Sequence, residues 1–177
     1  MLRIFMIYFI ITILATGNIL FAEESKPNSI SRDWSTFSEY CYIVSAAIKM
    51  EAFKNGERLT KVSRDKGRFY IKLSNGNENL YEGTYFAGFP LKIGSQAKLT
   101  IDNNTTFILY SHPKPSESKE KNYAWTHPND DTKIIVALKK GTKAIIESSS
   151  HTGKVIKDTF ALTGFTKSFQ TLEKACN

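Results

Sequence analysis

Two cysteines constrain the fold of this chain more than any other feature. Cys41 lies soon after an apolar leader, and Cys176 is the penultimate residue. In an exported domain, two thiols most simply form one disulfide. That bond would tie both ends of a single domain together, and closing so long a loop is worth roughly 2–5 kcal/mol. The alternative is a pair of reduced, buried thiols.

Residues 1–22 have the layout of a secretory signal peptide. One arginine precedes an apolar run over residues 4–14, and small and polar residues follow up to Ala22. Cleavage after Ala22 would place the protein in the periplasm or outside the cell. The alternative is an uncleaved anchor, because Leu20 is a large residue at the −3 position and residues 2–22 could span a bilayer. No later stretch is comparably apolar, so no transmembrane segment is expected after cleavage.

The rest of the chain predicts a polar lead-in over residues 23–33 and one β-rich domain over residues 34–177. Residues 68–73 give the clearest strand signal, because apolar Phe69, Ile71 and Leu73 alternate with polar neighbours. An aromatic segment over residues 81–89 contains two glycines, which suggest a bulge or bend. Further strands are predicted over residues 40–45, 97–101, 105–110, 143–148 and 155–162. Asp102, Asn103 and Asn104 separate two of these strands and tolerate a left-handed turn, which predicts a hairpin.

Two short helices complete the prediction. Residues 130–140 begin with acids, end with lysines and stop at Gly141. Thr166 can cap a final helix that places Phe165, Phe169, Leu172 and Cys176 on one inward face. These elements favour a mainly β fold, either a β-sandwich or a barrel-like antiparallel sheet, with two short helices of which the last lies at the C-terminus. A mixed α+β layer is the alternative.

No catalytic, nucleotide-binding or metal-binding signature accompanies this pattern. His112, His127 and His151 have no second ligand at metal-binding spacing. Ser150, His151 and Asp158 include the side chains of a hydrolase triad, but no Gly-x-Ser-x-Gly turn presents the serine. We therefore expect no enzymatic activity and no cofactor, with a hydrolase as the remote alternative.

The balance of charge is basic, with 24 Lys and Arg against 17 Asp and Glu and a net charge of +7. This excess favours anionic surfaces, although it also suits a soluble basic protein with no such partner. Arg68, Tyr70 and Lys72 would share one strand face, where the cations could contact phosphates or sulfates and the tyrosine could stack. The candidate anionic-ligand patch consists of Lys61, Arg64, Lys66, Arg68, Tyr70 and Lys72.

An ordered set of short landmarks resembles the invasion-associated locus B family. The block at residues 158–166 (DTFALTGFT), with Ala175 and Cys176 after it, resembles the closing signature of that family. The earlier landmarks are Trp34, residues 41–45 (CYIVS), 88–90 (GFP), 92–95 (KIGS), 124–125 (AW) and 137–141 (ALKKG). The resemblance implies an exported α-proteobacterial protein with a β-rich fold, linked in some members to host-cell invasion and without a known catalytic site.

These observations predict an exported, non-enzymatic protein of the cell envelope. Its expected partner is an anionic envelope or host-surface component, or another protein, and no nucleic acid is expected. The alternative function is that of a structural or stress-related periplasmic protein without a host ligand.

Overall fold

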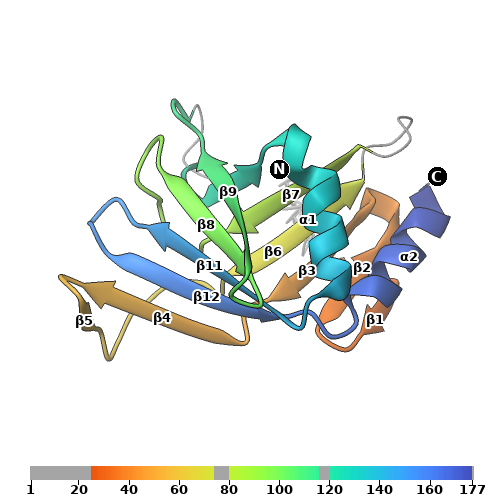
Figure 1. Ribbon diagram of the computed structural model, residues 1–177, viewed down its shortest axis with the longest axis horizontal. Coiled ribbons are helices and arrows are strands. Elements are labelled where there is room, and N and C mark those ends of the chain that lie inside the picture. Colours follow the sequence, from red (N-terminus) through yellow and green to blue (C-terminus); the bar gives the residue numbers. More distant parts are fainter. Residues whose placement is uncertain (1–24, 74–79, 116–119, 177) are drawn as a thin grey trace, which may run out of the picture.

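The computed structural model describes residues 25–73, 80–115 and 120–176 (Figure 1). The predicted signal peptide lies outside the described residues. Within them, twelve strands form one antiparallel sheet in the order β1-β2-β3-β6-β7-β10-β9-β8-β11-β12-β4-β5. The strands are β1 (Ser29–Ser31), β2 (Trp34–Phe37), β3 (Tyr42–Ala46), β4 (Lys49–Lys54), β5 (Glu57–Arg58), β6 (Arg68–Leu73), β7 (Tyr81–Phe86), β8 (Gln96–Ile101), β9 (Thr105–Ser111), β10 (Tyr123–Thr126), β11 (Lys143–Ser149) and β12 (Val155–Ala161).

The sheet curls because the continuous segment from β3 to β4 pairs with strands in both halves of the sheet. β3 pairs with β6 and β4 pairs with β12, and only Ala47 and Ile48 separate β3 from β4. The Ala47 N–H donates to the Gly67 carbonyl, whereas the Ile48 N–H donates to the Thr159 carbonyl, both at 2.8 Å. These two residues form a seam at which β12 approaches β3. The predicted mainly β fold is confirmed, and the continuous strand order favours the barrel-like form over two separate sheets.

The core lies inside the curl and beneath the two α-helices of the described chain, α1 (Pro128–Lys140) and α2 (Phe165–Cys176). α2 packs on the inner face of β2 and β3, where the Phe165 and Trp34 rings lie 4.9 Å apart. α1 contacts β7 and β9 through the buried face that includes Ile134 and Leu138. Neither described helix is long and apolar enough to cross a membrane.

Residues 68–73 form β6 with the predicted alternation. Phe69, Ile71 and Leu73 are buried in the core, so the intervening side chains of this strand face outward.

The predicted hairpin between residues 101 and 105 is also present. Asp102 and Asn103 take positive φ angles of 48° and 62°, which short polar side chains tolerate better than most others do.

Three local expectations differ from the structure. Thr166 lies within α2 instead of capping it, and its hydroxyl donates to the Lys139 carbonyl at 3.3 Å. β1 lies inside the stretch interpreted as a lead-in, where it pairs with β2. Gly83 marks a close approach instead of a bulge, because β7 keeps its register with β6 and an added Cβ would come within 2.6 Å of Thr126.

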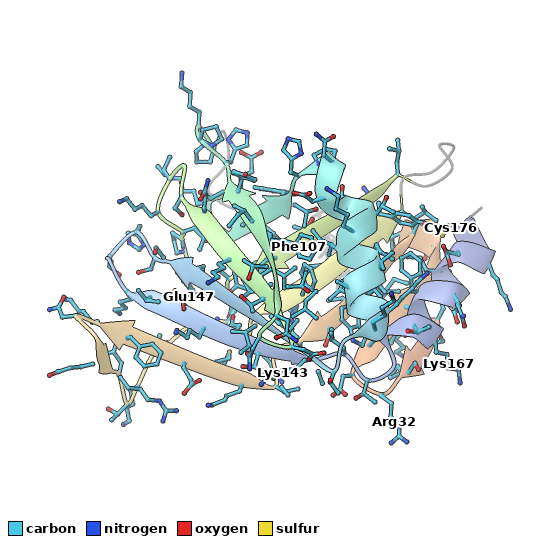
Figure 2. All side chains as sticks on the ribbon, in the orientation of Figure 1. Arg32, Phe107, Lys143, Glu147, Lys167 and Cys176 are labelled. Carbon is cyan, nitrogen blue, oxygen red and sulfur yellow. A yellow bond between two sulfur atoms is a disulfide. The ribbon has the colours of Figure 1, made fainter. Side chains whose placement is uncertain are left out.

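The predicted disulfide between Cys41 and Cys176 is present, with the two Cα atoms 5.9 Å apart. Figure 2 places Cys176 near the end of α2. Cys41 follows a single 3-10 turn, η1 (Ser38–Tyr40), and precedes β3. The bond therefore fastens the C-terminal helix to the connection between β2 and β3.

Candidate functional site

The outer face of neighbouring strands carries a continuous set of aromatic side chains. One register row runs from Tyr70 on β6 through Thr84 on β7 and Trp125 on β10 to Tyr110 on β9. Directly paired residues of antiparallel strands share a face, so these side chains point the same way. A parallel row joins Arg68, Phe86 and Tyr123. We call this surface the aromatic face, and its members are Phe37, Tyr42, Arg68, Tyr70, Lys72, Phe86, Tyr110, Tyr123 and Trp125.

Most rings of the aromatic face pack in two groups, one on each side of β6, whereas the ring of Tyr110 contacts His127. Phe37 and Tyr42 stack with centroids 4.8 Å apart, and Tyr42 lies 5.8 Å from Tyr70. On the other side of β6, the ring of Tyr123 lies 5.1 Å from Phe86 and 6.0 Å from Trp125. Rings held by their neighbours are ordered before a ligand arrives, which lowers the entropic cost of binding.

Arg68 and Tyr70 lie between two further tyrosines. Burial raises the pKa of Tyr42 and of Tyr123, the neighbouring Tyr70 raises both further, and the positive charge of Arg68 acts in the opposite direction. The hydroxyls of Tyr42 and Tyr123 consequently stay protonated at neutral pH and can both donate and accept hydrogen bonds. The guanidinium of Arg68 adds charged donors suited to a carboxylate, sulfate or phosphate.

An open hollow of about 690 Å³ lies over the β2, β3 and β6 end of this face. Its walls include the rings of Phe37, Tyr42 and Tyr70, the Arg68 side chain and the segment at residues 25–27. That segment is held in place by the next residue, Asn28, whose N–H donates to the Thr36 carbonyl at 2.8 Å and whose side-chain oxygen accepts from the Ser38 N–H at 2.7 Å. The size is within the range of small-ligand sites, roughly 300–1,000 Å³.

The predicted basic patch is only partly at the surface. Lys61, Lys66, Arg68 and Lys72 are exposed, and Tyr70 is half-buried. The expectation that Arg64 belongs with them is wrong, because its side chain is only 2% exposed.

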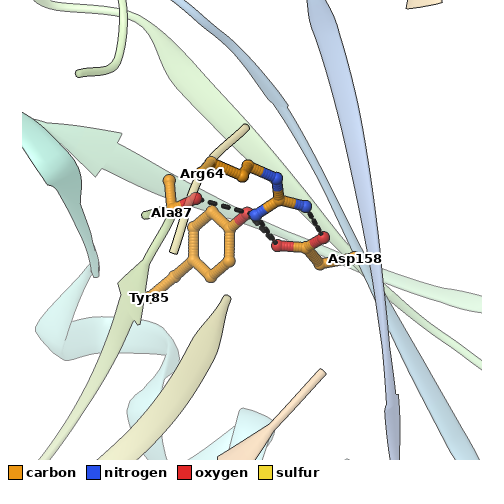
Figure 3. Close-up of polar contacts among 4 residues, drawn as sticks. All are labelled: Arg64, Tyr85, Ala87 and Asp158. Atoms are coloured by element: carbon orange, nitrogen blue, oxygen red, sulfur yellow. Dashed lines mark hydrogen bonds and ion pairs between the residues drawn. The ribbon is translucent and has the colours of Figure 1, made fainter. Parts of the chain in front are cut away.

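Arg64 instead neutralises a buried carboxylate (Figure 3). Its Nη1 donates to the Ala87 carbonyl at 2.8 Å and to Asp158 Oδ2 at 3.0 Å, while Nη2 pairs with Asp158 Oδ1. The Tyr85 hydroxyl donates to Asp158 Oδ2 at 2.7 Å. Burial, followed by the negative charge of Asp158, raises the pKa of Tyr85 well above its ordinary value. A buried carboxylate needs such partners, since an isolated buried charge is strongly unfavourable.

Gly67 fits tightly beside this cluster. An added Cβ there would lie 2.0 Å from Asp158 Oδ2, so a larger residue would displace the carboxylate. The cluster fixes the path of residues 64–67 into β6, and in this way it positions the first residue of that strand, Arg68.

The three side chains considered for a hydrolase do not come together. The Ser150 hydroxyl lies 3.1 Å from that of Thr152, and His151 Nδ1 lies 3.1 Å from the Pro90 carbonyl. Asp158 is four residues along the strand from the turn that ends at Lys154, a separation of roughly 13 Å in an extended chain. Its carboxylate is bound by Arg64 and Tyr85.

The remaining sequence candidates also have local partners. His127 caps α1 by accepting from the Asn129 N–H at 3.2 Å, and His112 accepts from the Lys114 N–H at 3.1 Å. In the described part of the chain, no group of three or more His, Cys, Asp or Glu residues is placed to hold a metal ion.

Comparisons with known proteins give no relative on which to build. No protein-family model matches the chain, and neither a curated protein nor a solved structure matches it. The case for a function therefore rests on the geometry of the aromatic face.

Sequence reasoning found Arg68, Tyr70 and Lys72 on one face but missed the rings around them. Phe86 and Trp125 are half-buried and alternate with buried neighbours along the chain, and such an alternation can be detected in a sequence. Their proximity to β6 depends on the pairing of β7 with β10, and no local pattern encodes that pairing.

Proposed function

We propose that this chain is an exported, non-enzymatic binding protein of the cell envelope, and that it recognises an anionic envelope or host-surface component through the aromatic face. The observation that carries the proposal is the placement of Arg68 among packed rings beside an open hollow. Export and a role in host-cell invasion are supported by the leader and by the resemblance to the invasion-associated locus B family, and they remain part of the proposal.

Recognition at this face must use side chains. β3, β6, β7 and β10 each pair with a strand on both sides, so their main-chain groups are engaged within the sheet. The face presents guanidinium and ammonium groups for charge, tyrosine hydroxyls for hydrogen bonds, and rings for stacking. This combination suits an anionic ligand that also has flat or apolar surfaces.

Binding to immobilised heparin and to phosphatidylglycerol vesicles, measured with the disulfide-bonded exported protein at increasing salt, tests the proposal. At least one of these surfaces should bind saturably, and the affinity should fall with salt because counterions screen the attraction. Arg68→Gln and Lys72→Gln should each weaken binding. The matched control is Arg58→Gln on the β4–β5 hairpin, which removes an exposed arginine that lies 3.4 Å from Glu51.

If the protein binds neither heparin nor the vesicles saturably, the proposal is overturned. That result would favour the alternative, a structural or stress-related periplasmic protein without a host ligand. Cell fractionation separates the alternative from a protein with a host-surface ligand, because constitutive retention in the periplasm is expected for the alternative and not for such a protein.

A further inference from the structure

We infer that the ligand of the aromatic face is an acidic polysaccharide that lies across the strands, with sugar rings on the aromatic side chains and a carboxylate or sulfate against Arg68. This inference rests on the proposed function and specifies its ligand. It follows from three properties of the face: its extent, the kind of contact its rings offer, and its low density of charge.

The face is too long for a single small anion. Its rings lie on six adjacent strands, β2, β3, β6, β7, β10 and β9, and strands in a sheet are about 4.8 Å apart. From Tyr42 on β3 to Tyr110 on β9 the face therefore extends across roughly 19 Å. An extended polymer could contact the whole row, whereas a phosphate or a single sugar would reach only one part of it.

The chemistry of the rings fits sugars. A pyranose presents C–H groups on its flat faces, which pack on aromatic rings, and hydroxyls around its edge. The half-buried tyrosines Tyr42, Tyr70 and Tyr123 provide both a ring surface and a hydroxyl that bonds to such an edge.

The charge on the face is sparse. Arg68 and Lys72 are its outward cations, and Lys26 lines the hollow. Asp33 lines the same hollow, and Glu82 is paired across from Lys72. A nucleic acid carries a charge at every nucleotide and demands a denser array of cations. A chain of sugars with intermittent carboxylates or sulfates matches a surface that is rich in rings and has few cations.

Trp125 provides a direct readout of how far a ligand extends. The chain has two tryptophans; Trp34 is fully buried in the core, and Trp125 is half-buried on β10, which β7 separates from the β6 wall of the hollow. A ligand confined to the hollow would leave Trp125 unperturbed. A chain that crosses the strands would change its emission, and Trp125→Phe would abolish that change.

The experiment is a fluorescence and calorimetric titration of the exported, disulfide-bonded protein with hyaluronan oligosaccharides of increasing length, because hyaluronan carries one carboxylate in each disaccharide and so matches the sparse charge of the face. We expect affinity to rise with length and the Trp125 signal to appear only with the longer chains. Inorganic polyphosphate, a linear polyanion without sugar rings, should bind at least tenfold more weakly than a hyaluronan chain of equal charge. Uncharged dextran should bind more weakly than hyaluronan because it lacks the carboxylate that pairs with Arg68.

Removal of single rings separates stacking from charge. Tyr70→Ala and Tyr123→Ala should each weaken hyaluronan binding by about tenfold or more, the loss expected for one stacked ring. The matched control is Phe53→Ala on β4, which removes a half-buried ring near Lys157 on the other half of the sheet and should leave affinity unchanged. Each variant must retain the cooperative unfolding transition of the parent protein, and Tyr70→Leu, which removes the ring but keeps an apolar side chain, replaces Tyr70→Ala if that variant does not.

The outcomes distinguish this inference from the function on which it rests. One possible outcome is salt-sensitive binding that requires Arg68 but neither Tyr70 nor Tyr123, has the same affinity for polyphosphate and does not change the Trp125 emission. This outcome would overturn the assignment of a polysaccharide, and the proposed anionic site would stand. Ring-dependent binding to phosphatidylglycerol vesicles without binding to hyaluronan would replace the polysaccharide with a lipid headgroup. No saturable binding to any of these probes would overturn both proposals.

Discussion

Arg64 and Asp158 form a bidentate ion pair inside the protein, although 94 residues separate them in the sequence. Their side chains are 2% and 0% exposed. Arg64 precedes β6, and Asp158 lies on β12 next to Thr159, whose carbonyl accepts the Ile48 N–H at the seam between β3 and β4. The pair therefore joins the two halves of the curled sheet close to the point where the chain passes between them.

Removing one partner of this pair should cost far more than removing both. Arg64→Met leaves the Asp158 carboxylate buried without its counterion and should lower the free energy of unfolding by about 3–5 kcal/mol. Arg64→Met combined with Asp158→Leu removes both charges and should recover most of that loss. Urea denaturation of both single variants and the double variant measures the coupling. Strictly additive losses would show that the pair does not act as a unit.

The sequence predicted the elements that local patterns define. The alternation at residues 68–73, the Asp102 and Asn103 turn and the inward face of the last helix all follow from spacing and residue type. Arg64 was misplaced because its neighbours are hydrophilic and exposed, so nothing nearby in the sequence reveals that it faces Asp158. The rings of the aromatic face were missed for the same reason, since their contacts depend on which strands pair.

The disulfide should stabilise the whole domain, because it fastens α2 to the turn before β3. Cys176→Ala should lower the free energy of unfolding by about 2–5 kcal/mol. Titration of the unreduced, denatured protein should find no free thiol. Reductant should destabilise the parent protein to the level of the variant and leave the variant unchanged. Two titratable thiols in the native protein would contradict the pairing.

Phe169 should be one of the most sensitive positions in the core. It is fully buried, its ring lies 5.7 Å from Phe165 and 5.1 Å from Tyr81, and Lys139 Nζ lies 4.2 Å above it. Phe169→Ala should leave a cavity and cost about 3–5 kcal/mol in thermal or urea unfolding. Val136→Ala on the exposed side of α1 is the control and should change stability by about 0.5 kcal/mol or less. Equal effects of the two substitutions would show that α2 does not dock through this face.

Tyr81 should make stability depend on pH in the alkaline range. Its hydroxyl donates to Glu173 Oε1 at 3.0 Å, and burial together with this bond raises the pKa of Tyr81 from 10.0 to about 12. Between these values the folded protein retains a proton that the unfolded chain has lost. The contribution of Tyr81 is therefore complete below pH 10 and is lost as the pH rises toward about 12.

The comparison of the parent protein with Tyr81→Phe isolates this contribution, because the other alkaline titrations are common to both. The difference in their free energies of unfolding, measured by urea denaturation at a series of pH values, should be constant up to about pH 10 and should shrink above it. Glu173→Gln removes the charge that disfavours the phenolate but keeps an acceptor for the hydroxyl, so it should make the decline shallower. A difference between the parent and Tyr81→Phe that stays constant through this range would show that Tyr81 titrates alike in the folded and unfolded chains, and that its bond to Glu173 does not hold the proton.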